Sequence, residues 1–185
     1  MRNTMTAITA ALLLAATVGC SSDSDEPTVS KATTPPATTS SPSPSPSPSQ
    51  ETYKLGDTVD IDADSKFSTA ALGFKDSGIA GVPGVLKSGQ KWVAVEVKVC
   101  NADTEPIIVT PFVWQLAYGD GGRFEATSMS GGDFPQPLYP VDAKVRGGDC
   151  VRGHVLFEVP KEGKAERVLY SPDALDEPVE WQVGK

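Results

Sequence analysis

The chain has 185 residues and a formal net charge of −8, from 24 acidic and 16 basic side chains. This length allows one domain of ordinary size, and the acidic balance argues against nucleic acid or an anionic membrane surface as a partner, since both reward basic patches. Composition changes along the chain: residues 1–19 are apolar, residues 20–50 are rich in Ser, Thr and Pro, and residues 51–185 have the mixed composition of a globular domain.

Residues 1–19 have the pattern of an export signal. Arg2 supplies a positive start, and the apolar stretch at residues 7–18 is shorter than the ~20 residues that span a bilayer. The ending Thr17-Val18-Gly19-Cys20 resembles the lipobox of bacterial lipoproteins, although Thr17 stands where that pattern usually has Leu. The resemblance implies cleavage after Gly19 and a lipid, diacylglyceryl and palmitate, on Cys20. The alternative is an ordinary signal peptide with a cysteine at its end by chance.

Residues 20–50 are predicted to be a disordered linker. Ser and Pro alternate strictly over residues 41–49, and proline favours extended polyproline II over helix or sheet. Thirty residues at ~3.1 Å each could reach roughly 90 Å. We therefore interpret the segment as a spacer between lipid and domain, and its Ser/Thr content is typical of O-glycosylated stalks.

From residue 58 onward apolar residues recur with a period of two, which is typical of half-buried β-strands. The expected strands are 58–64, 67–74, 91–101, 107–118, 122–127, 151–159, 167–170 and 179–183. The clearest places Val93, Val95, Val97 and Val99 on one face. Along 107–118, one side is predicted to hold Phe112, Trp114 and Leu116. Along 151–159, the residues predicted to face inward are Val151, Val155, Phe157 and Val159. Residues 51–185 are thus predicted to form an all-β, antiparallel immunoglobulin-like β-sandwich of about seven or eight strands.

Several short motifs occur in a characteristic order. Residues 91–101 end in Asn101 and are followed by Glu105-Pro106, and a later strand runs from Gly153 to Val159-Pro160. This order resembles a bacterial immunoglobulin-like domain of unknown function, common in lipoproteins of Gram-positive bacteria and related in fold to a secreted mycobacterial immunogenic antigen. The resemblance covers about residues 53–183. It implies an extracellular sandwich and brings no catalytic residues with it.

Two cysteines lie in the predicted domain, and in an exported protein Cys100 and Cys150 are expected to form a disulfide. Cys100 and Trp114 have antibody-like spacing, but both cysteines fall on the polar side of their strands. We therefore predict a bridge between neighbouring strands on the outer face of one sheet. That register places Lys98 opposite Arg152, and directly opposed like charges are unfavourable.

His154 is the single histidine and falls on the same polar face, near Glu96 in the predicted register. It could be a general base or metal ligand, but a surface histidine beside a carboxylate is the favoured interpretation. The sequence lacks a Gly-x-Ser-x-Gly elbow that would indicate a nucleophile. We therefore predict no catalytic residue.

Asp60, Asp62 and Asp64 suggest a calcium loop at first sight. An EF-hand would need Gly and Glu where Ser65 and Ala71 stand, so that interpretation fails. A solvated strand face is favoured, with weak Ca²⁺ binding left open. We predict no metal site and no cofactor.

The long connection at residues 129–146 is the candidate binding loop. It contains Phe134, Pro137, Leu138 and Tyr139, and prolines with aromatic rings form stiff apolar surfaces. The favoured alternative is that Phe134 and Tyr139 fold back to plug an open end of the sandwich.

These observations predict a monomeric protein that is lipid-anchored in the cell membrane and faces outward. Its domain would be a non-enzymatic binding or adaptor module that recognises an envelope protein or polymer. A passive spacer of the wall and an envelope-polymer hydrolase are the alternatives, and the hydrolase is the weaker of the two because no nucleophile, acid pair or metal set is recognisable.

Overall fold

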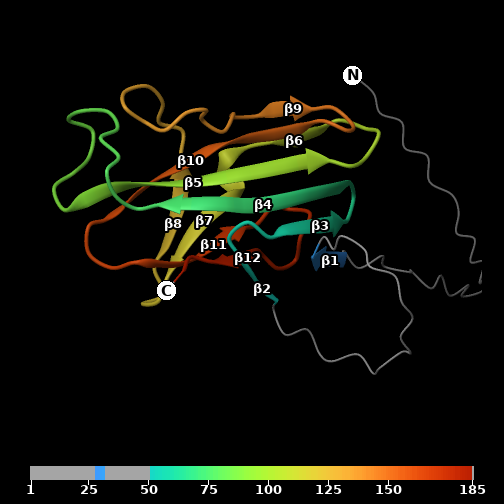
Figure 1. Ribbon diagram of the computed structural model, residues 1–185, viewed down its shortest axis with the longest axis horizontal. Coiled ribbons are helices and arrows are strands. Elements are labelled where there is room, and N and C mark those ends of the chain that lie inside the picture. Colours follow the sequence, from blue (N-terminus) through green and yellow to red (C-terminus); the bar gives the residue numbers. More distant parts are fainter. Residues whose placement is uncertain (1–27, 32–50, 185) are drawn as a thin grey trace, which may run out of the picture.

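The computed structural model describes residues 28–31 and 51–184, in which every regular element but one is a β-strand (Figure 1). The exception is η1, a turn of 3₁₀-helix at Pro111–Val113. The predicted signal peptide, Cys20 and most of the predicted linker lie outside the described residues. Within the described ranges, no helix is long and apolar enough to cross a membrane.

The described residues contain twelve strands. In chain order they are β1 (Thr28–Lys31), β2 (Thr52–Lys54), β3 (Thr58–Asp62), β4 (Lys66–Lys75), β5 (Gln90–Asn101), β6 (Ile107–Val109), β7 (Trp114–Tyr118), β8 (Arg123–Thr127), β9 (Ala143–Val145), β10 (Cys150–Pro160), β11 (Ala165–Tyr170) and β12 (Val179–Gln182). Ten of them form one curled sheet in the order β1-β3-β4-β5-β10-β8-β7-β11-β12-β2, and β6 pairs with β9 separately. Neighbours are antiparallel except β2, which runs parallel to β12.

The long sheet folds into a sandwich at β8, which pairs with β10 on one side and with β7 on the other. The core between the two layers takes Val95 and Phe157 from one layer and Trp114 and Trp181 from the other, all fully buried. The predicted all-β sandwich is confirmed. Its strand count exceeds the prediction for two reasons: β1, β2 and β9 have only three or four residues each, too few to establish a period, and the strand expected over 107–118 divides into β6 and β7.

The predicted alternation holds along the two longest strands. Val93, Val95, Val97 and Val99 of β5 are all buried in the core. On β10, the buried core residues are Val155, Phe157 and Val159, whereas Val151 near the strand end is half-buried. The period of two therefore identifies the inner face of both strands correctly.

The prediction of one strand over residues 107–118 is wrong. The stretch divides into β6, the turn η1 and β7, and Phe112 on η1 is 48% exposed instead of facing inward with Trp114. Pro111 explains the break, because proline has no amide hydrogen for a strand ladder and favours the first turn of a helix. After the turn, Trp114 and Leu116 face the core as predicted.

The predicted disulfide is present. Cys100 and Cys150 are register partners on β5 and β10, with their Cα atoms 4.0 Å apart. They lie on the outer face, as the polar parity predicts and unlike the core bridge of antibody domains. The same register places Lys98 opposite Arg152, so the predicted like-charge conflict exists. Arg152 turns to Glu96 instead, and its Nη2 and Nε atoms each lie 2.7 Å from Glu96 Oε1.

The opposite end of the same outer face carries a second apolar cluster. Trp92 and Ala94 of β5 and Leu156 of β10 are buried there, although the alternation points them away from the main core. Residues of two long loops, 76–89 and 128–142, cover them. Phe134 from the second loop packs edge-on against Trp92, with ring centres 4.9 Å apart. The second of these loops also lines the candidate functional site.

Candidate functional site

The predicted binding loop folds back onto the sandwich. Phe134 is 4% exposed in the second apolar cluster, and Tyr139 is 5% exposed in the main core. Pro137 is exposed and Leu138 is half-buried. The favoured alternative, that both rings fold back, is right about their burial, but Phe134 covers the outer face of β5 and β10 and does not plug an open end of the sandwich. Burial also raises the pKa of the Tyr139 phenol, which keeps it neutral at physiological pH.

Backbone contacts with β10 hold the loop in place. The amide of His154 donates to the carbonyl of Pro137 at 2.8 Å, and the amide of Tyr139 donates to the carbonyl of His154 at 2.9 Å. Gly153 makes this close approach possible. A Cβ atom at Gly153 would lie 2.6 Å from the nitrogen of Tyr139 and 2.7 Å from the carbonyl carbon of Leu138. The loop thus pairs with β10 at His154, just before Leu156 and Phe157, where β8 pairs with the same strand.

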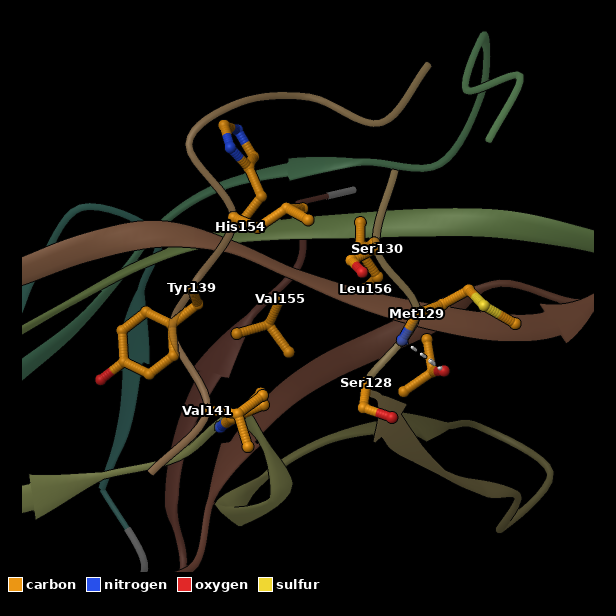
Figure 2. A pocket seen from close by; sticks show the side chains of 11 residues that line it. Ser128, Met129, Ser130, Tyr139, Val141, His154, Val155 and Leu156 are labelled. Carbon is orange, nitrogen blue, oxygen red and sulfur yellow. Dashed lines mark hydrogen bonds between the residues drawn. The ribbon is translucent and has the colours of Figure 1, made fainter. Parts of the chain in front are cut away.

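His154 is held by this loop. Its Nδ1 atom lies 3.1 Å from the carbonyl oxygen of Pro137. A carbonyl oxygen only accepts, so Nδ1 must donate, and in the neutral ring the lone pair is on Nε2. Glu96 is its register partner across the ladder, as predicted. In Figure 2 the ring points away from Tyr139 and Val155.

A pocket of about 100 Å³ lies between the loop and β10 (Figure 2). Most of its lining is apolar, and Thr127, Ser128 and Ser130 bring aliphatic hydroxyls from one segment; the lining residues are Pro111, Thr127, Ser128, Met129, Ser130, Leu138, Tyr139, Val141, His154, Val155 and Leu156. A cavity of ~150 Å³ accepts benzene, and drug-sized ligands need about 300 Å³ or more. The pocket is therefore the size for a single aliphatic group.

Three large apolar side chains are exposed on the chain segments that border this pocket. Ile108 is 69% exposed, and Phe112 and Val141 are each 48% exposed; they are the large apolar residues that are exposed in the described part of the chain. Val141 lines the pocket together with Pro111, the residue before Phe112. Ile108 lies on β6, whose neighbour Val109 pairs with Ala143 just beyond Val141. We call Ile108, Phe112 and Val141 the apolar patch.

The sequence prediction found the loop that lines the pocket but missed the exposed side chains around it. Within a single strand over residues 107–118, Phe112 has the same parity as Trp114 and Leu116, which places it on their side. The signal that could have corrected this assignment is Pro111, which interrupts strand pairing just before Phe112. Ile108 gave no such signal, because three consecutive apolar residues at 107–109 leave the inward face undefined.

The acidic residues considered for calcium lie on an ordinary strand surface. Asp60 and Asp62 are exposed on β3, and Asp64 is exposed just after it. Asp62 forms an ion pair with Lys66 at 3.4 Å. Over residues 28–31 and 51–184, no group of three His, Cys, Asp or Glu side chains is placed to hold a metal ion.

Comparison with known proteins gives a family and a fold. The family described as "Domain of unknown function (DUF4352)" matches residues 50–179. The solved structure of MPT63, a secreted protein from Mycobacterium tuberculosis, is 18% identical with a TM-score of 0.57, over 74% of this chain and all of that chain. The yjhA protein from Bacillus subtilis is 13% identical with a TM-score of 0.53, over 71% of this chain and 99% of that chain. A search of curated proteins finds no significant match. The two structures share the fold of this domain.

Proposed function

The chain belongs to the family described as domain of unknown function DUF4352, and from that premise we propose that it is an outward-facing lipoprotein whose sandwich binds another envelope protein without catalysing a reaction. The apolar stretch that ends at Cys20 supports export and anchoring. The description of MPT63 as a secreted protein agrees with export. The sandwich would be the part that meets a partner.

The observation that carries the binding proposal is the apolar patch beside the pocket. Ile108, Phe112 and Val141 leave apolar area in water that a partner would cover. Full burial of such side chains contributes roughly 1.5–3 kcal/mol each. The adjacent pocket would accept one aliphatic side chain of the partner, and an apolar side chain buried in a pocket is a typical anchor of protein–protein contacts.

Charge favours a protein over an anionic wall polymer as the partner. Removal of residues 1–19 deletes Arg2 and no acidic residue, so the mature chain would carry −9 instead of −8. A surface of this sign repels anionic polymers. The apolar lining of the pocket also offers few hydrogen bonds to a sugar.

The surroundings of His154 support binding over hydrolysis. In the described residues, the hydrogen bond of its ring goes to the carbonyl oxygen of Pro137, which cannot act as a nucleophile. Ser128 and Ser130 line the same pocket, but the His154 ring points away from its centre (Figure 2). A hydroxyl nucleophile needs a base within hydrogen-bond reach.

The experiment is crosslinking in intact cells, with a tag after Lys185 and mass spectrometry of the captured proteins. The test variant is Ile108→Ser with Phe112→Ser and Val141→Ser, all at exposed positions. The control is Lys164→Ser with Glu177→Ser and Gln182→Ser, exposed residues elsewhere whose joint change leaves the net charge unaltered. We expect one reproducible partner, whose capture falls at least tenfold in the test variant and is retained in the control.

Two other outcomes would contradict the proposal. Equal capture by both variants would exclude the apolar patch as the contact. The absence of any partner, in cells that express and anchor the protein, would favour a passive spacer. Cys20→Ala tests the anchor separately, since it should move the protein from the membrane fraction to the medium.

A further inference from the structure

β1 pairs with the edge of the sandwich although it lies in the segment predicted to be a linker. Thr28–Lys31 run antiparallel to β3, in a register that extends from Thr28 opposite Asp62 to Lys31 opposite Val59. This makes β1 the terminal strand of the ten-stranded sheet, and Figure 1 shows it beside β3. Four of the five residues of β3 therefore have a partner on each side.

The local sequence explains why pairing occurs at this point of a proline-rich segment. Residues 28–31 contain no proline, so each of the four has an amide that can donate, and Thr28 and Val29 are β-branched. Without β1, β3 would present a row of unpaired amides and carbonyls to solvent. The edge of β3 is thus a strand-acceptor site that the chain fills with its own segment.

This pairing changes where the domain is tethered. Eight residue steps separate Cys20 from Thr28, and thirty-two separate Cys20 from Thr52, where β2 begins. An extended chain spans at most ~3.6 Å per residue, so the two tethers reach at most about 29 Å and about 115 Å. When β1 is paired, residues 32–50 connect two points of the same domain and add nothing to its reach.

We propose that β1 is a latch that sets the distance between the domain and the membrane; this rests on the proposed lipid anchor at Cys20. With β1 paired to β3, the point at which the domain is attached, Thr28, stays within about 29 Å of the anchor. Release of β1 makes the tether four times longer. A four-residue edge strand is the kind of element that opens locally without global unfolding, so the two distances belong to one folded protein.

The first test asks whether β1 is paired within one chain. Ser30 and Asp60 are register partners, and both are exposed. Ser30→Cys with Asp60→Cys in the full lipidated chain should form an intrachain disulfide, since directly opposed residues have suitable Cα spacing. The control, Ser30→Cys with Asp64→Cys, moves the second thiol four residues out of register and should cross-link at least tenfold less. Cross-linking no higher than the control, or a disulfide between two chains, would overturn the proposal.

The second test measures the distance itself, by energy transfer between a dye on a tag after Lys185 and a lipid dye in vesicles that carry the protein. Val29→Pro with Ser30→Pro should release β1, because amides of adjacent strand residues point to opposite sides and one of the two faces β3. A tether four times longer has about twice the mean span, so transfer should fall. Ala37→Pro with Thr38→Pro adds the same prolines outside β1 and should not change it.

Equal transfer in the two proline variants would overturn the latch. Failure of the anchor is read separately, because an unanchored protein appears in the medium while the cross-link between positions 30 and 60 still reports whether β1 is paired. The oxidised Ser30→Cys, Asp60→Cys variant should show the transfer of the short tether. This reading holds even if the variant with two prolines fails to fold.

Discussion

The two ends of the β5–β10 ladder share one backbone pairing but treat their outer faces differently. The stapled end carries charged side chains around the Cys100–Cys150 disulfide and faces solvent. The covered end carries Trp92 and Leu156, which are buried because Phe134 and other loop residues lie over them. Strand alternation assigns all of these positions to the same face, so the difference comes from loops that are distant in sequence.

The two ends show two ways in which the same pair of strands is stabilised. At the stapled end, a disulfide and an ion pair hold β5 and β10 together while their outer face remains exposed to solvent. At the covered end, burial of aromatic area stabilises the strands and fixes the loop at the same time. The loop that is fixed in this way lines the candidate pocket, so the covered end links stability to the site.

The largest effect should come from uncovering the covered end. Phe134→Ala removes a buried ring from contact with Trp92 and should lower the free energy of unfolding by about 3–5 kcal/mol. Phe112→Ala is the matched control, because the same residue type is half-exposed there and should change stability by about 0.5 kcal/mol or less. Urea unfolding followed by tryptophan fluorescence measures both. Equal losses would mean that the loop does not pack on the domain in solution.

Breaking the staple should have the next largest effect. Cys100→Ala with Cys150→Ala opens a loop of sequence separation 50 and should destabilise the protein by about 2–4 kcal/mol. Changing both residues avoids a free thiol. The measurement is the urea midpoint of the double variant against the oxidised wild type. A shift worth less than about 0.5 kcal/mol would show that strand pairing alone constrains this end.

The stapled end could be predicted from the sequence almost completely. Parity along two long strands gives the inner valines, the outer cysteines, and even the opposition of Lys98 and Arg152. The covered end could not, because nothing in the alternation of β5 indicates that Trp92 is buried on its polar side. Such burial depends on contacts between residues 92 and 134, and local patterns carry no information about contacts at that separation.

In the candidate site, too, some features could be predicted from the sequence and others could not. Sequence reasoning identified the loop at residues 129–146 by its length and prolines, and the pocket does lie beneath it. For Phe134 and Tyr139 it left exposure and burial open and favoured burial, and both rings are buried. It placed Phe112 on the same side as Trp114 and Leu116, although Phe112 is exposed. Which ring of a proline-rich segment faces inward depends on the space available in the folded domain, and that space is set by other strands.

A smaller effect should follow from crowding the contact between the loop and β10. Gly153→Ala places a Cβ atom 2.6 Å from the backbone nitrogen of Tyr139, which forces the loop to shift and should cost about 1–3 kcal/mol. Gly73→Ala is the control, because its nearest neighbour, a side-chain atom of Glu96, would be 3.9 Å away. Urea unfolding of the two variants decides the matter. If Gly153→Ala is no more destabilising than the control, the loop does not approach β10 this closely.

The smallest expected effect concerns the charges of the stapled end. Glu96→Gln removes the carboxylate that Arg152 contacts at 2.7 Å and leaves Arg152 opposite Lys98 without compensation. Arg152 is exposed and Glu96 is half-buried, so solvent screens the pair and the loss should be about 0.2–1 kcal/mol. Lys98→Gln should be neutral or slightly stabilising, because it removes the like charge instead of its compensation.

The salt dependence distinguishes charge compensation by Glu96 from a short-range hydrogen bond to Arg152. The Debye length falls from about 30 Å at 0.01 M to about 3 Å at 1 M ionic strength, so the difference between Glu96→Gln and the wild type should shrink as salt is added. Urea unfolding of both proteins at the two ionic strengths gives that difference directly. A loss that stays constant would show that Glu96 acts through its short hydrogen bond from Arg152, and not by compensating the opposed charges of Lys98 and Arg152.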